Sequence, residues 1–289
     1  MSGTIRSSLF LALLACLPAC YEPVEGCLDV EAVNYDLEAD KNNGEECQYP
    51  QIRMALQHRY TKGDTLLRFG LVDSVYLDAL GNPFRLNSVR FYLSNFHLIY
   101  TDGQEKEVEE TIDILIPQPD GSDLPRTIED NFSLISPRVT QNYVIGTLKE
   151  SGTLQEIRFA VGVEGLANQA DPASFPGTHP LSLQDSSLYF NQDSGYVFQY
   201  IELFRDTTAA DTIPEILRIG TPAYLQEVRL PVDFRKNRGF HLLLTLQVDY
   251  SRWFSQIDAR QDSPEQLIEK IVANLAQSFS IVAIVQQGS

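Results

Sequence analysis

Hydrophobic and polar residues alternate one by one along much of the chain after residue 50. Every second side chain is apolar in EIRFAVGV (156–163), EVRLPVDF (227–234) and FHLLLTLQVDY (240–250). A period of two is the pattern of a β-strand that turns one face to a core. Seven further segments have the length and composition of strands: TLLRFGLV (65–72), VRFYLSNFHLIY (89–100), EETIDILI (109–116), YVIGTL (143–148), GYVFQYIELF (195–204), EILRIG (215–220) and FSIVAIV (279–285). The pattern therefore predicts about ten strands.

One helix is indicated near the C-terminus. Ser263 fits the capping position, Pro264 the first helical position, and Gln266 completes a capping box. Apolar residues follow at helical spacing, at Leu267, Ile268, Ile271, Val272 and Leu275. Turn-rich stretches separate the strands, and we find no internal repeat or second domain boundary. Residues 51–289 are therefore predicted to form an all-β domain, an antiparallel β-sandwich of immunoglobulin-like or jelly-roll-like type with one C-terminal helix.

The first twenty residues have the pattern of an export signal. Arg6 precedes an apolar run over residues 9–17, which ends in LPAC. This run is too short to cross a bilayer, which takes roughly 20 residues, but it matches the apolar region of a signal peptide. A cysteine directly after it resembles the lipobox of bacterial lipoproteins, which implies removal of residues 1–19 and acylation of Cys20. A rival site, LLAC, ends at Cys16, and an ordinary signal peptide without lipidation is the remaining alternative.

Lipid attachment would place the mature protein in the cell envelope of a Gram-negative bacterium, at the outer membrane or the cell surface. No later stretch is apolar and long enough to span a membrane. The net charge is −17, and residues 20–50 alone hold nine acidic residues and one lysine. An acidic chain without a basic stripe argues against binding to nucleic acid or anionic lipid head-groups. The lipid anchor is therefore the only membrane contact that we expect.

Two cysteines remain in the mature chain if Cys20 is acylated. Cys27 and Cys47 are then an even pair in an exported, oxidising setting, which predicts a disulfide. Closing a loop of about 20 residues contributes roughly 3 kcal/mol in the chain-entropy estimate. The enclosed sequence has no hydrophobic periodicity and cannot fold on burial alone. We interpret residues 20–50 as an acidic linker that the disulfide staples.

This linker resembles the short modules with the pattern GC…NYD…C-YP that follow the lipid anchor in many surface proteins of Bacteroidota. Four oxygen-bearing side chains would suit calcium: Asp29, Asn34, Asp36 and Asp40. The acidic pair that usually precedes the glycine is replaced here by two asparagines, at 42–43. A stapled spacer is therefore the favoured interpretation of the linker, and calcium within residues 27–47 is the alternative.

Five blocks in the main domain occur in the order seen in MbnP-like proteins. They are VRFYLSNFHL (89–98), GTLKESGTLQEIRFAVGVEGLAN (146–168), HPLS…LYF…SGYVFQYIEL (179–203), LRIG (217–220) and LTLQVDYSRWF (244–254). These proteins are the copper-binding partners associated with methanobactin systems, and many lipoprotein versions occur in Bacteroidota. The resemblance implies an all-β sandwich. For the best-understood members it also implies a copper site built from histidines and an oxidised Trp that a partner di-haem enzyme makes.

Several of the family's metal-site positions differ in this sequence. Phe190 and Gln192 stand at the two Trp positions of the family's MYWxWxSGY stretch, and Arg218 replaces the His of its HIG motif. The resemblance leaves His179, in the HPL segment, and His97, in the SNFHL block, as candidate metal ligands. Two neutral imidazoles on a rigid sheet can hold Cu(I). We expect at most one modest copper site, without an oxidised Trp; the alternative for each histidine is an ordinary hydrogen-bonded imidazole.

Aromatic residues make up 10% of the chain, an amount that a core can absorb. Tyr196, Phe198 and Tyr200 share one strand face, and burial explains that face more simply than a sugar-binding platform. We interpret Trp253, the one tryptophan, as a core or rim side chain rather than a modified cofactor residue.

The sequence carries no G-x-S-x-G, H-E-x-x-H, P-loop or C-x-x-C motif. Acidic strand residues such as Glu202 and Asp249 could pair as in a glycosidase, but alternation alone does not bring them together. We therefore predict that the protein is not an enzyme.

Two functions remain: an MbnP-like envelope lipoprotein that binds copper through a degenerate His site, or a non-catalytic surface module that binds a glycan or partner protein without metal. The expected partners are a di-haem peroxidase-like protein or a TonB-dependent transporter.

Overall fold

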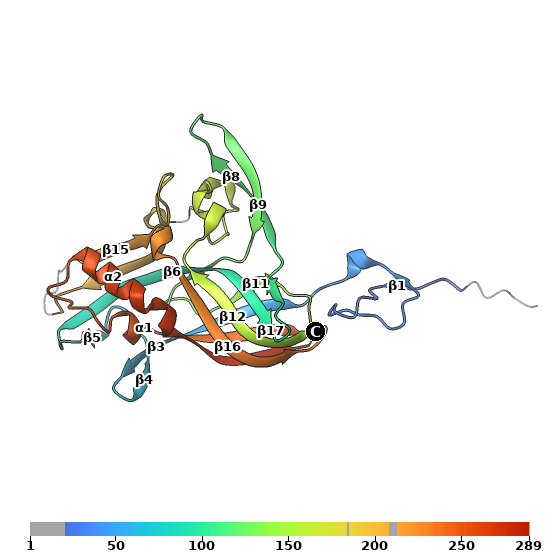
Figure 1. Ribbon diagram of the computed structural model, residues 1–289, viewed down its shortest axis with the longest axis horizontal. Helices are drawn as coiled ribbons and strands as arrows, with labels where there is room; N and C mark the ends of the chain where they lie inside the picture. Colours follow the sequence, from blue (N-terminus) through green and yellow to red (C-terminus); the bar gives the residue numbers. More distant parts are fainter. Residues whose placement is uncertain (1–20, 184, 208–212, 289) are drawn as a thin grey trace, which may run out of the picture.

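The computed structural model describes residues 21–183, 185–207 and 213–288. The predictions for the signal peptide and for acylation at Cys20 lie outside these residues. Two β-sheets form the main body, a helix lies across one end, a hairpin projects from one side, and a small N-terminal module extends from the other end (Figure 1). The predicted all-β sandwich with one C-terminal helix is confirmed.

The larger sheet has nine strands, and its main path runs β13-β14-β6-β12-β16. Its strands are β5 (Val75–Leu77), β6 (Pro83–Tyr100), β7 (Glu105–Glu107), β10 (Ser133–Ile135), β12 (Gly152–Val161), β13 (Tyr189–Asn191), β14 (Gly195–Phe204), β15 (Glu215–Gly220) and β16 (Gln226–Lys236). The first half of β6 pairs with β14 and the second half with β12, both antiparallel. Strand β6 is 18 residues long and carries His97.

The smaller sheet has five strands, in the order β11-β3-β17-β18 with β4 beside β3. They are β3 (Gln51–Lys62), β4 (Thr65–Arg68), β11 (Asn142–Thr147), β17 (His241–Asp249) and β18 (Phe279–Gln287). Strand β3 was not predicted, although Ile52, Met54 and Tyr60 alternate with polar residues. Its parallel pairing with β17 was not predicted either. A parallel partner leaves no turn in the sequence to indicate the pairing.

A second missed strand is β9 (Asp123–Glu129), which forms an antiparallel hairpin with β8 (Thr111–Pro117). The segment has no predicted strand because its first residues belong to the turn-rich stretch PQPDGSDLP (117–125), which includes Pro125. A two-stranded hairpin has free edges, and proline is tolerated on an edge strand. This hairpin projects from the body at the top of Figure 1.

Two hydrophobic cores lie on opposite faces of the larger sheet. The first fills the space between the sheets and includes the predicted inward faces of β12, β16 and β17 together with Trp253, which is 0% exposed. The second lies beneath the β8–β9 hairpin and the loops before β14. Strand β14 belongs to both, since Ile201 faces the first core while Phe198 and Tyr200 face the second. The predicted burial of the aromatic face is confirmed.

The predicted helix is α2 (Pro264–Leu275), and a one-turn helix, α1 (Tyr250–Trp253), precedes it. The Ser263 hydroxyl accepts a hydrogen bond from the Gln266 amide, and the Gln266 side chain accepts one from the Ser263 amide, so the capping box is confirmed. Short 3-10 turns complete the fold: η1 (Gly44–Glu46), η2 (Gly165–Gln169), η3 (Pro172–Ser174), η4 (Ser186–Leu188), η5 (Pro222–Tyr224) and η6 (Ala276–Ser278). Within the described residues, no helix is long and apolar enough to cross a membrane.

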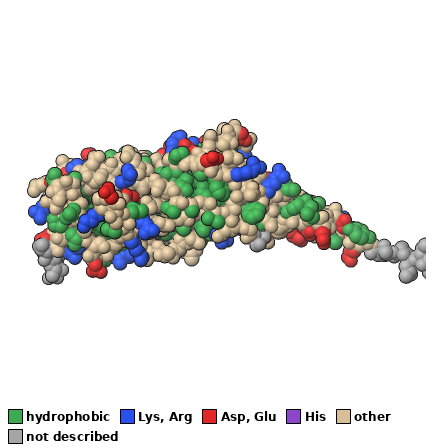
Figure 2. All heavy atoms as spheres, turned by 90° about the horizontal axis from the view of Figure 1, so that it is seen from below, with side chains coloured by type: hydrophobic (Ala, Val, Ile, Leu, Met, Phe, Trp, Pro, Cys, Tyr) green, Lys and Arg blue, Asp and Glu red, His purple; other side chains and the backbone are tan. Residues whose placement is uncertain are grey.

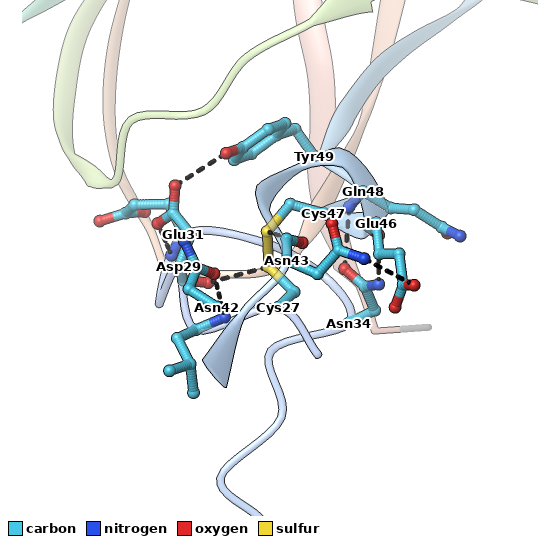
Figure 3. Close-up of a disulfide and its surroundings, with 11 residues drawn as sticks. Cys27, Asp29, Glu31, Asn34, Asn42, Asn43, Glu46, Cys47, Gln48 and Tyr49 are labelled. Atoms are coloured by element: carbon cyan, nitrogen blue, oxygen red, sulfur yellow. Dashed lines mark hydrogen bonds between the residues drawn. A yellow bond between two sulfur atoms is a disulfide. The ribbon is translucent and has the colours of Figure 1, made fainter. Parts of the chain in front are cut away.

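The N-terminal module, residues 21–49, contains the predicted disulfide between Cys27 and Cys47 (Figure 3). Two very short parallel strands, β1 (Glu25–Gly26) and β2 (Lys41–Asn42), are its only sheet. Acidic side chains gather on the narrow end of the molecule that this module forms (Figure 2). The prediction of an acidic segment closed by a disulfide is therefore confirmed.

Candidate functional site: the histidines and the 178–190 loop

His179 is held by both ring nitrogens. The Nδ1 atom accepts a hydrogen bond from the Leu181 amide at 3.1 Å, and Nε2 lies 2.8 Å from the Asp130 carboxylate. Because Nδ1 is the acceptor, the proton of the neutral ring is on Nε2, which donates to Asp130. The ring stacks on Phe175 at 4.6 Å between centroids, and the residue is only 9% exposed.

His179 and Asp130 line a cleft of about 490 Å³ beside the base of the β8–β9 hairpin. Glu110 lies in the same lining, and its carbonyl accepts a hydrogen bond from the Asp130 amide at 2.8 Å. The Asp130 carboxylate beside the His179 ring and Glu110 in the same lining give this cleft an acidic character. No sequence motif pointed to Asp130, because it follows a strand that was not predicted.

His97 lies on β6 and has different partners. Its Nε2 is 2.7 Å from the Asn95 side-chain oxygen, and its Nδ1 is 3.1 Å from Glu105. The same Glu105 oxygen accepts a hydrogen bond from Arg158 at 2.9 Å. Asn95 has a left-handed backbone, with φ 56°, and its amide donates to Asn131 at 2.6 Å. The hydrogen bonds of Asn95 therefore fix the orientation of the His97 ring.

The two candidate ligands belong to separate hydrogen-bond networks. The short segment 130–131 lies between them, since Asp130 bonds to His179 while Asn131 bonds to the backbone beside His97. Across residues 21–183, 185–207 and 213–288, no group of three or more His, Cys, Asp or Glu side chains is placed to hold a metal ion.

The other two histidines also make structural contacts. His58 Nδ1 is 2.8 Å from the buried Tyr250 hydroxyl, and burial lowers the pKa of His58 to about 4. His241 Nδ1 accepts a hydrogen bond from the Gln51 amide at 2.9 Å, and burial also lowers its pKa. All four histidines of the chain thus use at least one ring nitrogen for a contact within the protein.

Arg218 contacts the loop before β14, near the positions where the resemblance implied an oxidised Trp. Its guanidinium donates to the carbonyl of Ser187 at 3.2 Å and to that of Tyr189 at 2.5 Å. It also lies over the ring of Phe190, 4.5 Å from the centroid. A planar cation with several donors suits two carbonyls and an aromatic face at once. Arg218 therefore fixes β15 to the loop before β14.

A second arginine fixes the same loop from β6. Arg90 forms an ion pair with Asp185 and lies 4.4 Å from the centroid of the Tyr200 ring. The hydrogen bond from Arg90 lowers the pKa of Asp185 to about 2. The two arginines together hold residues 185–190 against the larger sheet.

The oxygen-bearing side chains of the module do not fit a calcium site. Asp29 accepts hydrogen bonds from the Glu31 amide and the Tyr49 hydroxyl, which lower its pKa (Figure 3). Asn34 bridges two backbone groups of residues 46–48. These side chains thus make hydrogen bonds within the module, whereas calcium needs six or more oxygens around one point.

The copper site implied by the resemblance is not assembled from these residues either. His179 and His97 each have their own hydrogen-bond partners, and the Arg218 guanidinium stands where the resemblance expects an imidazole. Both cysteines among the described residues are in the disulfide, and Met54, the one methionine among them, is 0% exposed in the core. The assignment of His179 and His97 as copper ligands stays a prediction.

Comparison with known proteins points to one family. A family model described as MbnP matches residues 49–271. Among solved structures, MbnP from Methylosinus trichosporium aligns with 71% of this chain and 78% of its own chain, at 14% identity and a TM-score of 0.41. A search of curated proteins finds no match.

Proposed function

This chain belongs to the MbnP family, and from that premise we propose that it is a non-catalytic binding protein of the bacterial cell envelope that works without copper. The observation that carries the proposal is the role of Arg218. Its permanent positive charge sits at the position where the resemblance expects the His of the HIG motif, and it donates to the carbonyls of Ser187 and Tyr189. Arginine has no lone pair to offer a metal.

A second candidate function, copper binding at His179, is favoured by the cleft that this residue lines. The carboxylates of Asp130 and Glu110 lie in the same cleft and attract cations. Binding at Nε2 would release the proton now shared with Asp130, and binding at Nδ1 would break the bond from Leu181. Either route costs a contact that orders the loop.

A competition titration with a coloured Cu(I) chelator distinguishes the two candidates. Mature wild-type protein, His179→Ala and His97→Ala are compared, with His241→Ala as a control for loss of a histidine outside the loop. We expect all four to leave the copper with the chelator to the same extent. One equivalent withdrawn by the wild type and the control, but not by His179→Ala, would overturn the copper-free proposal.

The variant Arg218→His tests whether copper binding can be gained. It removes the guanidinium and restores an imidazole near Phe190. We expect a gain in copper binding relative to the wild type if Arg218 is what prevents it. Equal copper retention by Arg218→His and the wild type would show that another feature of the loop is responsible.

We also propose that the protein is anchored by a lipid at Cys20. The support is the apolar run that ends in LPAC and the folded acidic module that begins directly after it. Labelling with a fatty-acid probe should disappear in Cys20→Ala and persist in Cys16→Ala. The opposite result would move the acylation site to Cys16.

The two predicted partner classes differ in how well they agree with this proposal. A di-haem peroxidase-like protein would find Phe190 and Gln192, rather than Trp, at the positions that the resemblance assigns to oxidation. A TonB-dependent transporter requires no such residue and is the partner class that we retain.

A further inference from the structure

A cleft of about 960 Å³ lies apart from the four histidines. Four segments meet around it: residues 116–119 at the end of β8, 163–169 after β12, 192–194 before β14, and 221–225 after β15. The sequence analysis assigned no role to three of these segments. The fourth contains Gln192, where the resemblance expected a Trp.

The lining combines neutral hydrogen-bonding groups with an apolar base and contains no lysine, arginine or histidine. Four primary amides contribute to it, from Gln118, Asn168, Gln169 and Gln192. Two hydroxyls and two carboxylates add further acceptors, while proline rings, Val163 and Leu225 supply apolar surface. Anionic ligands are disfavoured because Asp193 and Glu164 are the only charged groups of the lining.

The amides are partly fixed before any ligand arrives. The Asn168 side-chain oxygen accepts a hydrogen bond from the Tyr196 amide at 2.9 Å, which orients its NH₂ group. Gly195 has φ 71°, and a Cβ there would stand 2.3 Å from the Asn168 carbonyl oxygen, so only glycine allows this approach. Gln192 donates to the Gln169 carbonyl at 2.9 Å and accepts from the Tyr189 hydroxyl at 3.1 Å.

Polar groups in this lining also remain available to a ligand. Within the described part of the chain, the side chains of Gln169, Asp193 and Thr221 make no hydrogen bond or ion pair. The carboxylate of Glu164, by contrast, accepts a hydrogen bond from Asn95 at 2.8 Å. The cleft therefore offers both donors and acceptors, with one of its two carboxylates already engaged.

Thr221 carries backbone strain at the edge of the cleft. Its φ of 85° and ψ of 149° lie in a region that is almost reserved for glycine, and Thr is β-branched. Such a conformation costs about 1–3 kcal/mol and persists where the surroundings impose it, often at ligand sites. Its neighbours leave little room: a Cβ on Gly220 would stand 2.6 Å from the Phe190 ring, and Pro222 follows directly.

We propose that this cleft binds a neutral carbohydrate chain, with the amides of Asn168, Gln169 and Gln192 and the hydroxyl of Thr221 contacting sugar hydroxyls. A sugar hydroxyl both donates and accepts, and so do the mixed amide groups of the lining. The C–H faces of the sugar find the apolar surface of Pro222 and Leu225. The inference rests on the proposed function and names the ligand class of a binding protein.

The test is retention of the mature protein on a panel of immobilised glycans, with neutral polysaccharides beside anionic ones and a lysine-rich peptide. We expect retention by at least one neutral polysaccharide. Gln192→Ala and Asn168→Ala should each weaken it by about tenfold, which corresponds to roughly 1.4 kcal/mol for the lost amide contact and the lost order of the lining. Gln261→Ala is the matched control, because Gln261 is an exposed amide outside the cleft.

Thr221→Gly separates ligand binding from folding. Glycine accepts the backbone angles of residue 221 without strain, so the melting temperature should not fall. Glycan binding should nevertheless weaken, because the hydroxyl is lost and the segment is less constrained. A variant with unchanged melting temperature and unchanged affinity would remove Thr221 from the proposed site.

The same panel is run with a copper chelator and with added Cu(I), so that the carbohydrate proposal and the copper-free proposal can fail independently. Retention only by anionic glycans or by the peptide, or by no neutral glycan, overturns the carbohydrate inference and leaves the copper-free function standing. Retention of a neutral glycan that requires copper overturns the copper-free function and leaves the cleft assignment standing.

Discussion

The N-terminal module and the β-sandwich differ in what holds them together. Only two hydrophobic side chains of the module, Cys27 and Ala32, are buried. Its order comes from the disulfide and from short polar contacts, such as those of Asn34 with the backbone at Glu46 and Gln48 (Figure 3). The sandwich instead buries dozens of apolar side chains between two sheets and a helix.

The difference follows from chain length. A segment of about 30 residues cannot enclose enough apolar surface to offset its conformational entropy, so a covalent link must constrain the unfolded state. A domain of about 240 residues can form a core and needs no cysteine, and residues 51–289 contain none. The two regions should therefore respond independently to most substitutions.

They meet at a joint centred on Glu31. Its carboxylate accepts hydrogen bonds from Ser151 at 2.8 Å and from Arg238 at 3.1 Å. Close by, Lys149 lies over the ring of Tyr49 at 4.1 Å, and a Cβ on Gly239 would stand 2.9 Å from a module carbonyl. The module is thus docked on the end of the sandwich.

The largest effect is expected in the sandwich core. Trp253 is fully buried, contacts the Phe91 ring edge-on at 5.3 Å, and donates to Ser278 at 2.8 Å. Trp253→Ala should cost about 3–5 kcal/mol of unfolding free energy through the cavity that it leaves. Chemical denaturation measures this, with Trp253→Phe as the smaller change. A loss below about 1 kcal/mol would contradict the assignment of Trp253 to the core.

Loss of the disulfide should affect the module alone. The double variant Cys27→Ser, Cys47→Ser should destabilise residues 21–49 by about 3 kcal/mol, because their unfolded chain is no longer closed into a loop. Hydrogen exchange of the module should accelerate accordingly, while the melting temperature of the sandwich stays unchanged. A lower melting temperature for the sandwich would show that the two regions fold as one unit.

A stabilising substitution is expected at Gln199. This residue is 0% exposed, and within the described residues neither its side-chain oxygen nor its nitrogen has a hydrogen-bond partner. Gln199→Met keeps the shape and removes the unpaired amide, so the unfolding free energy should rise by about 1–2 kcal/mol. A loss of stability would show that the amide is hydrogen-bonded through an internal water molecule.

The smallest effect is expected at the joint. Glu31→Gln keeps the side-chain size but loses the charge that faces Arg238, which is largely exposed, so about 1 kcal/mol or less should be lost. Faster proteolysis between module and sandwich is the expected readout. Glu38→Gln is the control, because Glu38 is an exposed module residue outside the joint. Equal cleavage of both variants would argue against a docked module.

The candidate site shows which features local sequence patterns can predict and which they cannot. The loop 178–190 and the strand that follows it were located from the HPL and SGYVFQYIEL blocks, and His179 does line a cleft. Its partner Asp130 was not anticipated, because the two residues are 49 positions apart and belong to different elements. The carbonyl contacts of Arg218 depend on the backbone path of the loop, which no side-chain pattern encodes.

The sequence by itself determined the elements whose cause is local. Alternation, segment length and composition indicated ten strands, the capping box specified the start of α2, and the even cysteine pair predicted the disulfide, since each rests on residues close together in the chain or on counting. Tertiary structure alone decided the rest: the parallel pairing of β3 with β17, the separate networks of His97 and His179, and the cleft where four distant segments meet. Each of these depends on which surfaces pack together when the two cores close, and that packing is a property of the whole chain.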